Sequence, residues 1–145
     1  MKFKKLFIVA VAMVCMMAFG QSAFAGTGIY DTKETAGMLF PLPIDQRQMT
    51  ISDSSDVDWY VYTNYTSTPK SFSAYLTAPN PSYKFEGSFK YVSGFESGIL
   101  VANGYTTFSF INIRLLPGES FYLKITATNP TLDFYTLDAV ANNTI

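Results

Sequence analysis

Apolar and polar residues alternate with a period of two along most of the chain after residue 25. In residues 120–128, for example, Phe121, Leu123 and Ile125 fall on one side of an extended chain and Lys124 falls on the other. Such alternation is typical of strands that bury one face. Bounded by turn residues, it predicts strands at residues 48–52, 58–65, 71–77, 83–92, 98–102, 106–115, 120–128 and 132–140.

One strand changes parity along its length. Phe108 and Phe110 share one face of residues 106–115, whereas Ile111 and Ile113 share the other. A β-bulge, or a bend between two sheets, would produce this change because an extra residue shifts all later side chains to the opposite face.

The turn signals complete the prediction of the fold. Asn103-Gly104 is a common tight-hairpin pair and predicts a hairpin between residues 98–102 and 106–115. Short strands separated by turns about every ten residues favour an all-β protein. We therefore expect an antiparallel β-sandwich, jelly-roll-like, of about eight short strands in residues 44–145. An irregular N-terminal lead-in, residues 26–43, precedes it.

The first 25 residues have the features of a cleaved signal peptide. Three lysines precede an apolar run from Leu6 to Phe19, and small residues stand at Ala23 and Ala25. The run is shorter than the roughly 20 residues of a membrane-spanning helix. We expect a secreted, extracellular protein that has no membrane contact after cleavage. Its only cysteine, Cys15, is lost with the signal, so the exported chain has no disulfide.

Composition excludes several classes of chemistry. The chain contains no histidine, which rules out imidazole general bases, Ser-His-Asp triads and His-ligated zinc. Its formal net charge is −1, and nucleic-acid binders show a basic footprint instead. Composition therefore favours a protein that is not an enzyme and does not bind nucleic acid.

Several segments resemble the bacterial pre-peptidase C-terminal domain family. Residues 54–62, which read SSDVDWYVY, look like the family's D-x-D-W/Y-Y/F strand. Upstream, residues 31–36 resemble its N-terminal acidic segment. Downstream, residues 116–125 (LPGESFYLKI) and 135–137 (YTL) are similar to its two late strands. The likeness covers roughly residues 31–140.

The resemblance implies a β-sandwich without catalytic activity. The family is often appended to secreted proteases, and some members bind calcium or a polymer such as collagen. Where the family has a Glu and an Asn before the first Asp, this chain has Ile29 and Tyr30, which lack side-chain carboxylates.

Four acids form the candidate metal site. Asp53, Asp56 and Asp58 lie within six residues, and Asp31 could join them. Calcium takes six to eight oxygen ligands, and a short acidic loop can supply several. The alternative is a solvated Asp/Ser turn, which is a common composition.

Four tyrosines form the candidate ligand-binding set: Tyr60, Tyr62, Tyr75 and Tyr122. Tyrosine offers a flat apolar ring and a hydroxyl, which suit sugar rings and protein surfaces. The alternative is ordinary strand composition, in which tyrosine is enriched. Trp59 is expected to pack the sandwich or to shield the acidic loop.

Three hypotheses for function follow. The first is a secreted binding or accessory module that engages an extracellular polymer or protein and that calcium would stabilise if the acids bind it. The second is a regulator, either inhibitor or folding partner, of a secreted hydrolase. The third is a carboxylate-based hydrolase that would use acids such as Asp58 and Glu119. The oligomeric state is left open.

Overall fold

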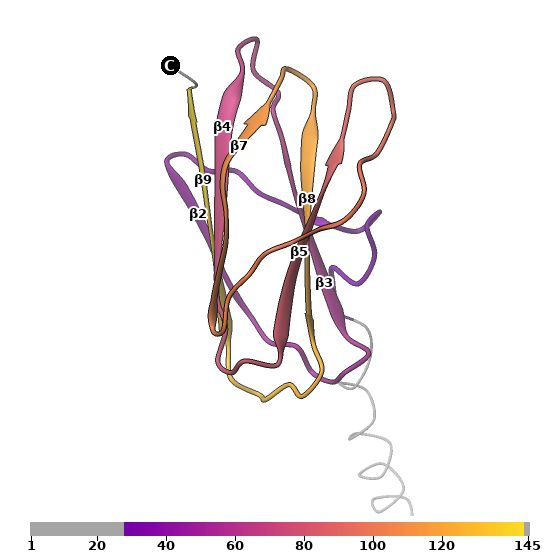
Figure 1. Cartoon of the computed structure of the whole chain (residues 1–145), viewed down its shortest axis with the longest axis vertical. Coiled ribbons are helices and arrows are strands. Elements are labelled where there is room, and N and C mark those ends of the chain that lie inside the picture. Colours follow the sequence, from indigo (N-terminus) through magenta and orange to yellow (C-terminus); the bar gives the residue numbers. More distant parts are fainter. Residues whose placement is uncertain (1–27, 144–145) are drawn as a thin grey trace, which may run out of the picture.

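The computed structural model describes residues 28–143, and every regular element among them is a β-strand (Figure 1). Its nine strands are β1 (Gly37–Met38), β2 (Ile44–Met49), β3 (Val57–Thr63), β4 (Lys70–Thr77), β5 (Tyr83–Lys90), β6 (Leu100–Val101), β7 (Thr107–Leu115), β8 (Ser120–Ala127) and β9 (Tyr135–Asn143). The prediction of an all-β fold is confirmed.

Two sheets face each other and form the sandwich. One has five strands in the order β1-β3-β8-β5-β6, and the other has four in the order β2-β9-β4-β7. All pairings are antiparallel except that of β1 with β3, which is parallel. Figure 1 shows the two layers nearly edge on, with β3 and β8 in one layer and β4 and β9 in the other.

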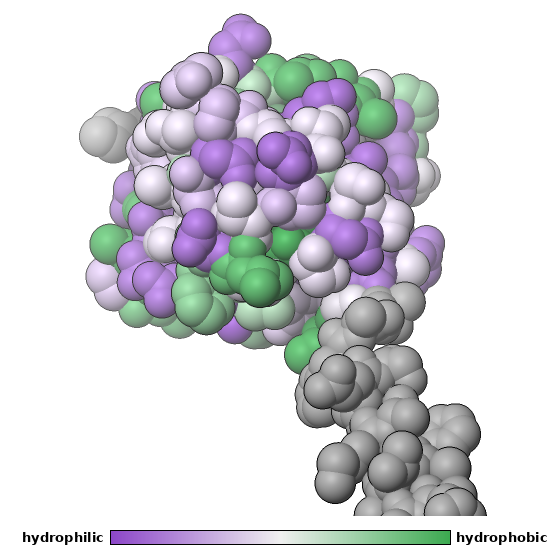
Figure 2. All heavy atoms as spheres, turned by 90° about the horizontal axis from the view of Figure 1, so that it is seen from below, coloured by the Kyte–Doolittle hydropathy of each residue, from purple (hydrophilic) through white to green (hydrophobic). Residues whose placement is uncertain are grey.

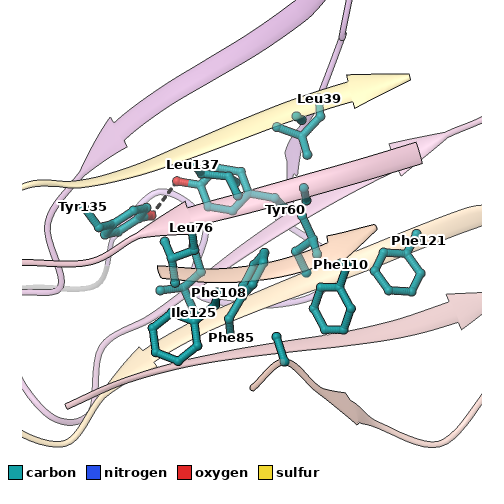
Figure 3. Packing of buried hydrophobic residues seen from close by; sticks show 14 of the residues in the cluster. Leu39, Tyr60, Leu76, Phe85, Phe108, Phe110, Phe121, Ile125, Tyr135 and Leu137 are labelled. Atoms are coloured by element: carbon teal, nitrogen blue, oxygen red, sulfur yellow. Dashed lines mark hydrogen bonds between the residues drawn. The ribbon is translucent and has the colours of Figure 1, made fainter. Parts of the chain in front are cut away.

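The core lies between the sheets and is built from alternate positions. Phe121, Leu123 and Ile125 of β8 are fully buried, as their spacing predicts, and they meet Leu76 and Leu137 of the opposite sheet (Figure 3). Phe121 contacts the rings of neighbouring phenylalanines at centroid distances between 4.9 and 6.1 Å. Burial of these side chains is the main stabilising contribution in a chain without disulfides.

The predicted irregularity in the seventh strand is confirmed. The pairing of β4 with β7 slips between Phe72 and Ala74, so that Phe72 faces Ile113 and Ala74 faces Phe110. Between these two pairs β7 has one residue more than β4, and Asn112 in this stretch has a positive φ of 57°. A left-handed residue of this kind is typical of a bulge, and asparagine tolerates it better than other residues that carry a Cβ.

The predicted hairpin at Asn103-Gly104 is wrong. β6 pairs with β5 in one sheet, whereas β7 belongs to the other sheet. The chain therefore crosses between the layers at this point, and Gly104 makes only an isolated bridge with Phe108. Burial of Phe108 and Phe110 against the opposite sheet outweighs the local turn preference.

The N-terminal region differs from its expectation in two ways. The lead-in carries a short strand, β1, beside β3, and β2 begins at Ile44 rather than at residue 48. The expected signal peptide, residues 1–25, lies outside the described residues. Within the part of the chain that is described, no helix is long and apolar enough to cross a membrane.

Candidate functional site

Three of the four predicted metal ligands meet at one end of the sandwich. Asp58 occupies the second position of β3, Asp56 lies in the turn before it, and Asp31 comes from the lead-in. One carboxylate oxygen from each lies within 4.8 Å of the others. A backbone hydrogen bond of 2.8 Å from Trp59 N to Tyr30 O holds the lead-in beside β3 and thereby positions Asp31.

Two oxygens of this cluster are enclosed without a partner. Oδ1 of Asp31 and Oδ1 of Asp56 are buried and accept no hydrogen bond from any described residue. Gly28 packs directly against the cluster, since a Cβ added there would lie 2.7 Å from Asp31 Oδ1. None of the ion pairs in residues 28–143 involves the three acids. Enclosed carboxylate oxygens of this kind are costly unless a cation compensates them.

Asp58 is the most deeply buried member of the cluster, with 2% of its surface exposed. The Tyr135 hydroxyl donates a 2.6 Å hydrogen bond to Asp58 Oδ2. A further hydrogen bond of 2.7 Å joins the Tyr135 and Tyr60 hydroxyls, both in the core (Figure 3). The pKa of Asp58 is raised to about 6, chiefly by burial; the Tyr135 hydrogen bond opposes this rise, and the nearby carboxylates of Asp56 and Asp31 add to it.

Asp53, the fourth predicted ligand, lies outside the cluster. Its Oδ1 accepts hydrogen bonds from the backbone N–H and the hydroxyl of Ser55, at 2.7 and 2.6 Å. These bonds lower its pKa. Asp53 therefore belongs to a solvated Asp/Ser turn, in agreement with the alternative interpretation. Asp31, Asp56 and Asp58, in contrast, form a group that could bind a metal ion.

The predicted tyrosines divide into two pairs. Tyr60 and Tyr62 are buried, with 1% and 8% of their surfaces exposed, so they do not lie on an outer binding face as expected. Tyr122 lies at an outward position of β8, and Tyr75 is 36% exposed on β4 of the other sheet. Tyr75 and Tyr122 therefore lie on opposite outer faces of the sandwich.

Trp59 lies outward beside Tyr122 rather than in the core. The Lys33 ammonium is 4.5 Å from the Tyr122 ring centroid and 6.0 Å from that of Trp59, and Lys124 is 5.8 Å from the Trp59 ring. Lys33 also pairs with Glu96 at 2.5 Å. Sequence patterns did not indicate this aromatic and cationic face, because its residues come from distant segments.

The two acids of the hydrolase hypothesis are far apart. In the β3–β8 register Asp58 pairs with Ile125, whereas Glu119 lies just beyond the Thr63–Ser120 pair at the other end. Six strand positions separate them by roughly 20 Å. Paired carboxylates in glycosidases lie about 5–9.5 Å apart. Glu119 instead accepts a hydrogen bond from Leu116 N and closes its own turn.

Comparison with known proteins gives likenesses in structure and none in sequence. No family model matches the chain, and no curated protein matches it. Among solved structures, the chain is similar to the pre-peptidase C-terminal domain of a collagenase from Bacillus anthracis. That domain shows 12% identity over 74% of this chain and 94% of that chain, with a TM-score of 0.49.

Two other solved structures are similar to the chain. The periplasmic inhibitor of g-type lysozyme, PliG, from Aeromonas hydrophila shows 8% identity over 74% of this chain and 96% of that one, with a TM-score of 0.45. The mitogen from Yersinia pseudotuberculosis shows 17% identity over 67% and 84%, with a TM-score of 0.45. At these identities and TM-scores the likenesses assign no function to this chain, and its fold class is shown by the strand topology described above.

Proposed function

We propose that this chain is a secreted, non-catalytic accessory module whose N-terminal segment is fastened to the sandwich by calcium. The observation that carries the proposal is the convergence of three carboxylates, of which two present enclosed oxygens without a partner. All-oxygen donor sets suit hard cations such as calcium. The cluster offers carboxylates alone, with no imidazole or thiolate that would favour a softer metal.

The ion would be held by Asp31, Asp56 and Asp58, with backbone carbonyls and water completing its shell. Those three residues come from the lead-in, the β2–β3 turn and the start of β3. One cation would therefore join three segments and offset the repulsion among three carboxylates. For an extracellular module we expect a Kd of about 10⁻⁴–10⁻³ M.

Calorimetric melting in calcium and in chelator tests this proposal. The wild-type melting temperature should rise at millimolar calcium, because the ion binds the folded state alone. Asp56→Asn should remove the rise, whereas Asp53→Asn, in the same turn but outside the cluster, should keep it. An unchanged wild-type melting temperature at 10 mM calcium would disprove the metal site.

The partner in this proposal is an extracellular polymer that contacts the outer face of the five-stranded sheet. Trp59 and Tyr122 offer adjacent rings there, and Lys33 and Lys124 place positive charge beside them. Lys33 is paired with Glu96 and Lys124 with Glu86, so the face suits stacking on the uncharged rings of a polymer rather than contact with anionic groups. The end view in Figure 2 shows mainly hydrophilic residues with separate apolar patches, so we place binding on the sheet face rather than on that end.

Retention on insoluble cell-wall and matrix polymers tests this surface. Tyr122→Ala and Trp59→Ala should each lower retention severalfold, whereas Tyr75→Ala, on the opposite face, should not. Equal losses for all three variants would count against this face. Co-purification with one secreted hydrolase, without polymer retention, would favour the regulator hypothesis instead.

A further inference from the structure

A pocket lies at the end of β3 opposite the acidic cluster. The elements that line it, the end of β3 and the start of β4, lie near the upper end of the ribbon in Figure 1. Its volume is about 160 Å³. It lies between the segment after β1, the end of β3 with the loop that follows it, the start of β4 and the end of β9. The lining residues are Leu39, Phe40, Pro41, Leu42, Tyr62, Thr63, Tyr65, Thr66, Lys70 and Ala141.

The lining is mainly apolar, and several of its side chains are exposed to solvent. Leu39 is buried, while Phe40, Leu42 and Tyr65 are 59%, 90% and 74% exposed. Large apolar side chains that gather around a hollow mark binding sites more often than single exposed residues do. A volume of this size is close to the roughly 150 Å³ that accommodates one benzene ring.

Tyr62 is a buried residue whose hydroxyl has no hydrogen-bond partner among the described residues. Its ring is stacked on Phe72 at 4.8 Å, and 8% of the residue is exposed. Within residues 28–143 the hydroxyl makes no hydrogen bond, and its oxygen is not completely shielded from solvent. Tyr62 lines the pocket, so its unpaired hydroxyl is a donor that the proposed ligand would use.

Lys70 places a positive charge at the rim. Its ammonium donates a 2.6 Å hydrogen bond to Asn143 Oδ1, which is a neutral acceptor. The ion pairs of the described chain involve other cations, so no carboxylate there neutralises Lys70. The pocket therefore combines an apolar cavity, a free phenol and a cation available to an anionic group.

We propose that this pocket binds one apolar side chain of a partner polypeptide together with an adjacent carboxylate. The side chain fills the space beside Leu39 and Ala141, Lys70 pairs with the carboxylate, and the Tyr62 hydroxyl donates to it or to the neighbouring carbonyl. A sugar is disfavoured because its hydroxyl groups would be left unpaired against an apolar lining. The proposal does not rest on calcium binding, since the pocket and the acidic cluster share no residue.

Amide NMR titration with N-acetyl-L-phenylalanine tests the proposal. The signals of pocket residues should shift saturably, with a Kd of about 1–10 mM for so small a ligand. N-acetyl-L-phenylalaninamide, which lacks the carboxylate, should bind at least fivefold more weakly. Recording the titration in EDTA separates its outcome from that of the metal proposal.

Variants make the assignment specific. Lys70→Met should remove the preference for the acid over the amide, and Tyr62→Phe should weaken binding severalfold. Leu42→Ser should weaken it as well, whereas Leu132→Ser, at a similarly exposed position outside the pocket, should not. The proposal is overturned by the absence of saturable shifts at 50 mM, by equal binding of acid and amide, or by tighter binding of N-acetylglucosamine in this pocket.

Discussion

The hydroxyl of Tyr135 donates a 2.6 Å hydrogen bond to the carboxylate of Asp58 across the space between the two sheets. Tyr135 begins β9 of the four-stranded sheet, and Asp58 lies on β3 of the five-stranded sheet. Burial raises the pKa of Tyr135 well above its ordinary value, so the phenol stays protonated and remains a donor. The acidic cluster is thereby connected to the centre of the core.

Removal of this hydroxyl should destabilise the protein. Tyr135→Phe leaves a buried carboxylate without its donor and breaks the bond to Tyr60, so the free energy of unfolding should fall by about 1–3 kcal/mol. Tyr62→Phe is the matched control, because the Tyr62 hydroxyl makes no hydrogen bond within the described residues. Urea unfolding measures both, and an equal effect of the two variants would contradict the role assigned to Tyr135.

Stability of the metal-free protein should depend on pH through Asp58. Its folded pKa of about 6 lies above the ordinary value of 3.8, so the folded state binds the proton more tightly. The contribution of Asp58 is therefore most favourable below about pH 4 and falls as pH rises to about 6, by roughly 3 kcal/mol.

Comparison with Asp58→Asn isolates this contribution. In EDTA the variant should be more stable than the wild type at pH 7, and the two should converge near pH 4.5. Urea unfolding at the two pH values provides the test. A constant difference between the two proteins would show that Asp58 ionises normally in the folded chain.

Gly28→Ala should weaken the ion site without unfolding the sandwich. The added Cβ would lie 2.7 Å from Asp31 Oδ1, so that carboxylate must move away from the cluster. We expect an at least tenfold weaker affinity in terbium luminescence titration, in which terbium replaces calcium. Gly98→Ala is the control, because nothing lies within 4 Å of a Cβ at Gly98. Unaltered terbium affinity in Gly28→Ala would show that Asp31 does not bind the ion.

Gly87→Ala should destabilise the core. A Cβ at Gly87 would lie 2.5 Å from Phe121 Cζ, and Phe121 is fully buried among other rings. Overpacking of this kind costs about 1–3 kcal/mol. Thermal melting should show a lower transition temperature for Gly87→Ala than for Gly98→Ala, and equal values would mean that Phe121 relaxes freely.

The bulge in β7 gives a test of backbone conformation. Asn112 has a φ of 57°, which alanine adopts at a cost of about 1–2 kcal/mol. Asn112→Ala should therefore lower the free energy of unfolding, whereas Asn112→Gly should leave it nearly unchanged. Chemical denaturation compares the two variants. An alanine variant more stable than the glycine variant would show that residue 112 does not adopt the positive φ of the bulge.

The sequence by itself determined the strands and most of their faces. Alternation placed Phe72, Ala74 and Leu76 on one buried face, and it located the bulge near Ile111. These features depend on the period of an extended chain, which is a local property. The acidic turn was likewise visible, because its residues are close together in the sequence.

Tertiary structure decided which face of β3 is buried and which acids meet. Val57, Trp59 and Val61 form the more apolar side of β3, yet Asp58, Tyr60 and Tyr62 face inward. Tyr135, 77 residues from Asp58, supplies the hydrogen bond that makes this burial tolerable. Similarly, Asp31 joins Asp56 and Asp58 while Asp53 turns to Ser55. Partners brought together by packing leave no periodic signal in the chain, so only the assembled sandwich reveals them.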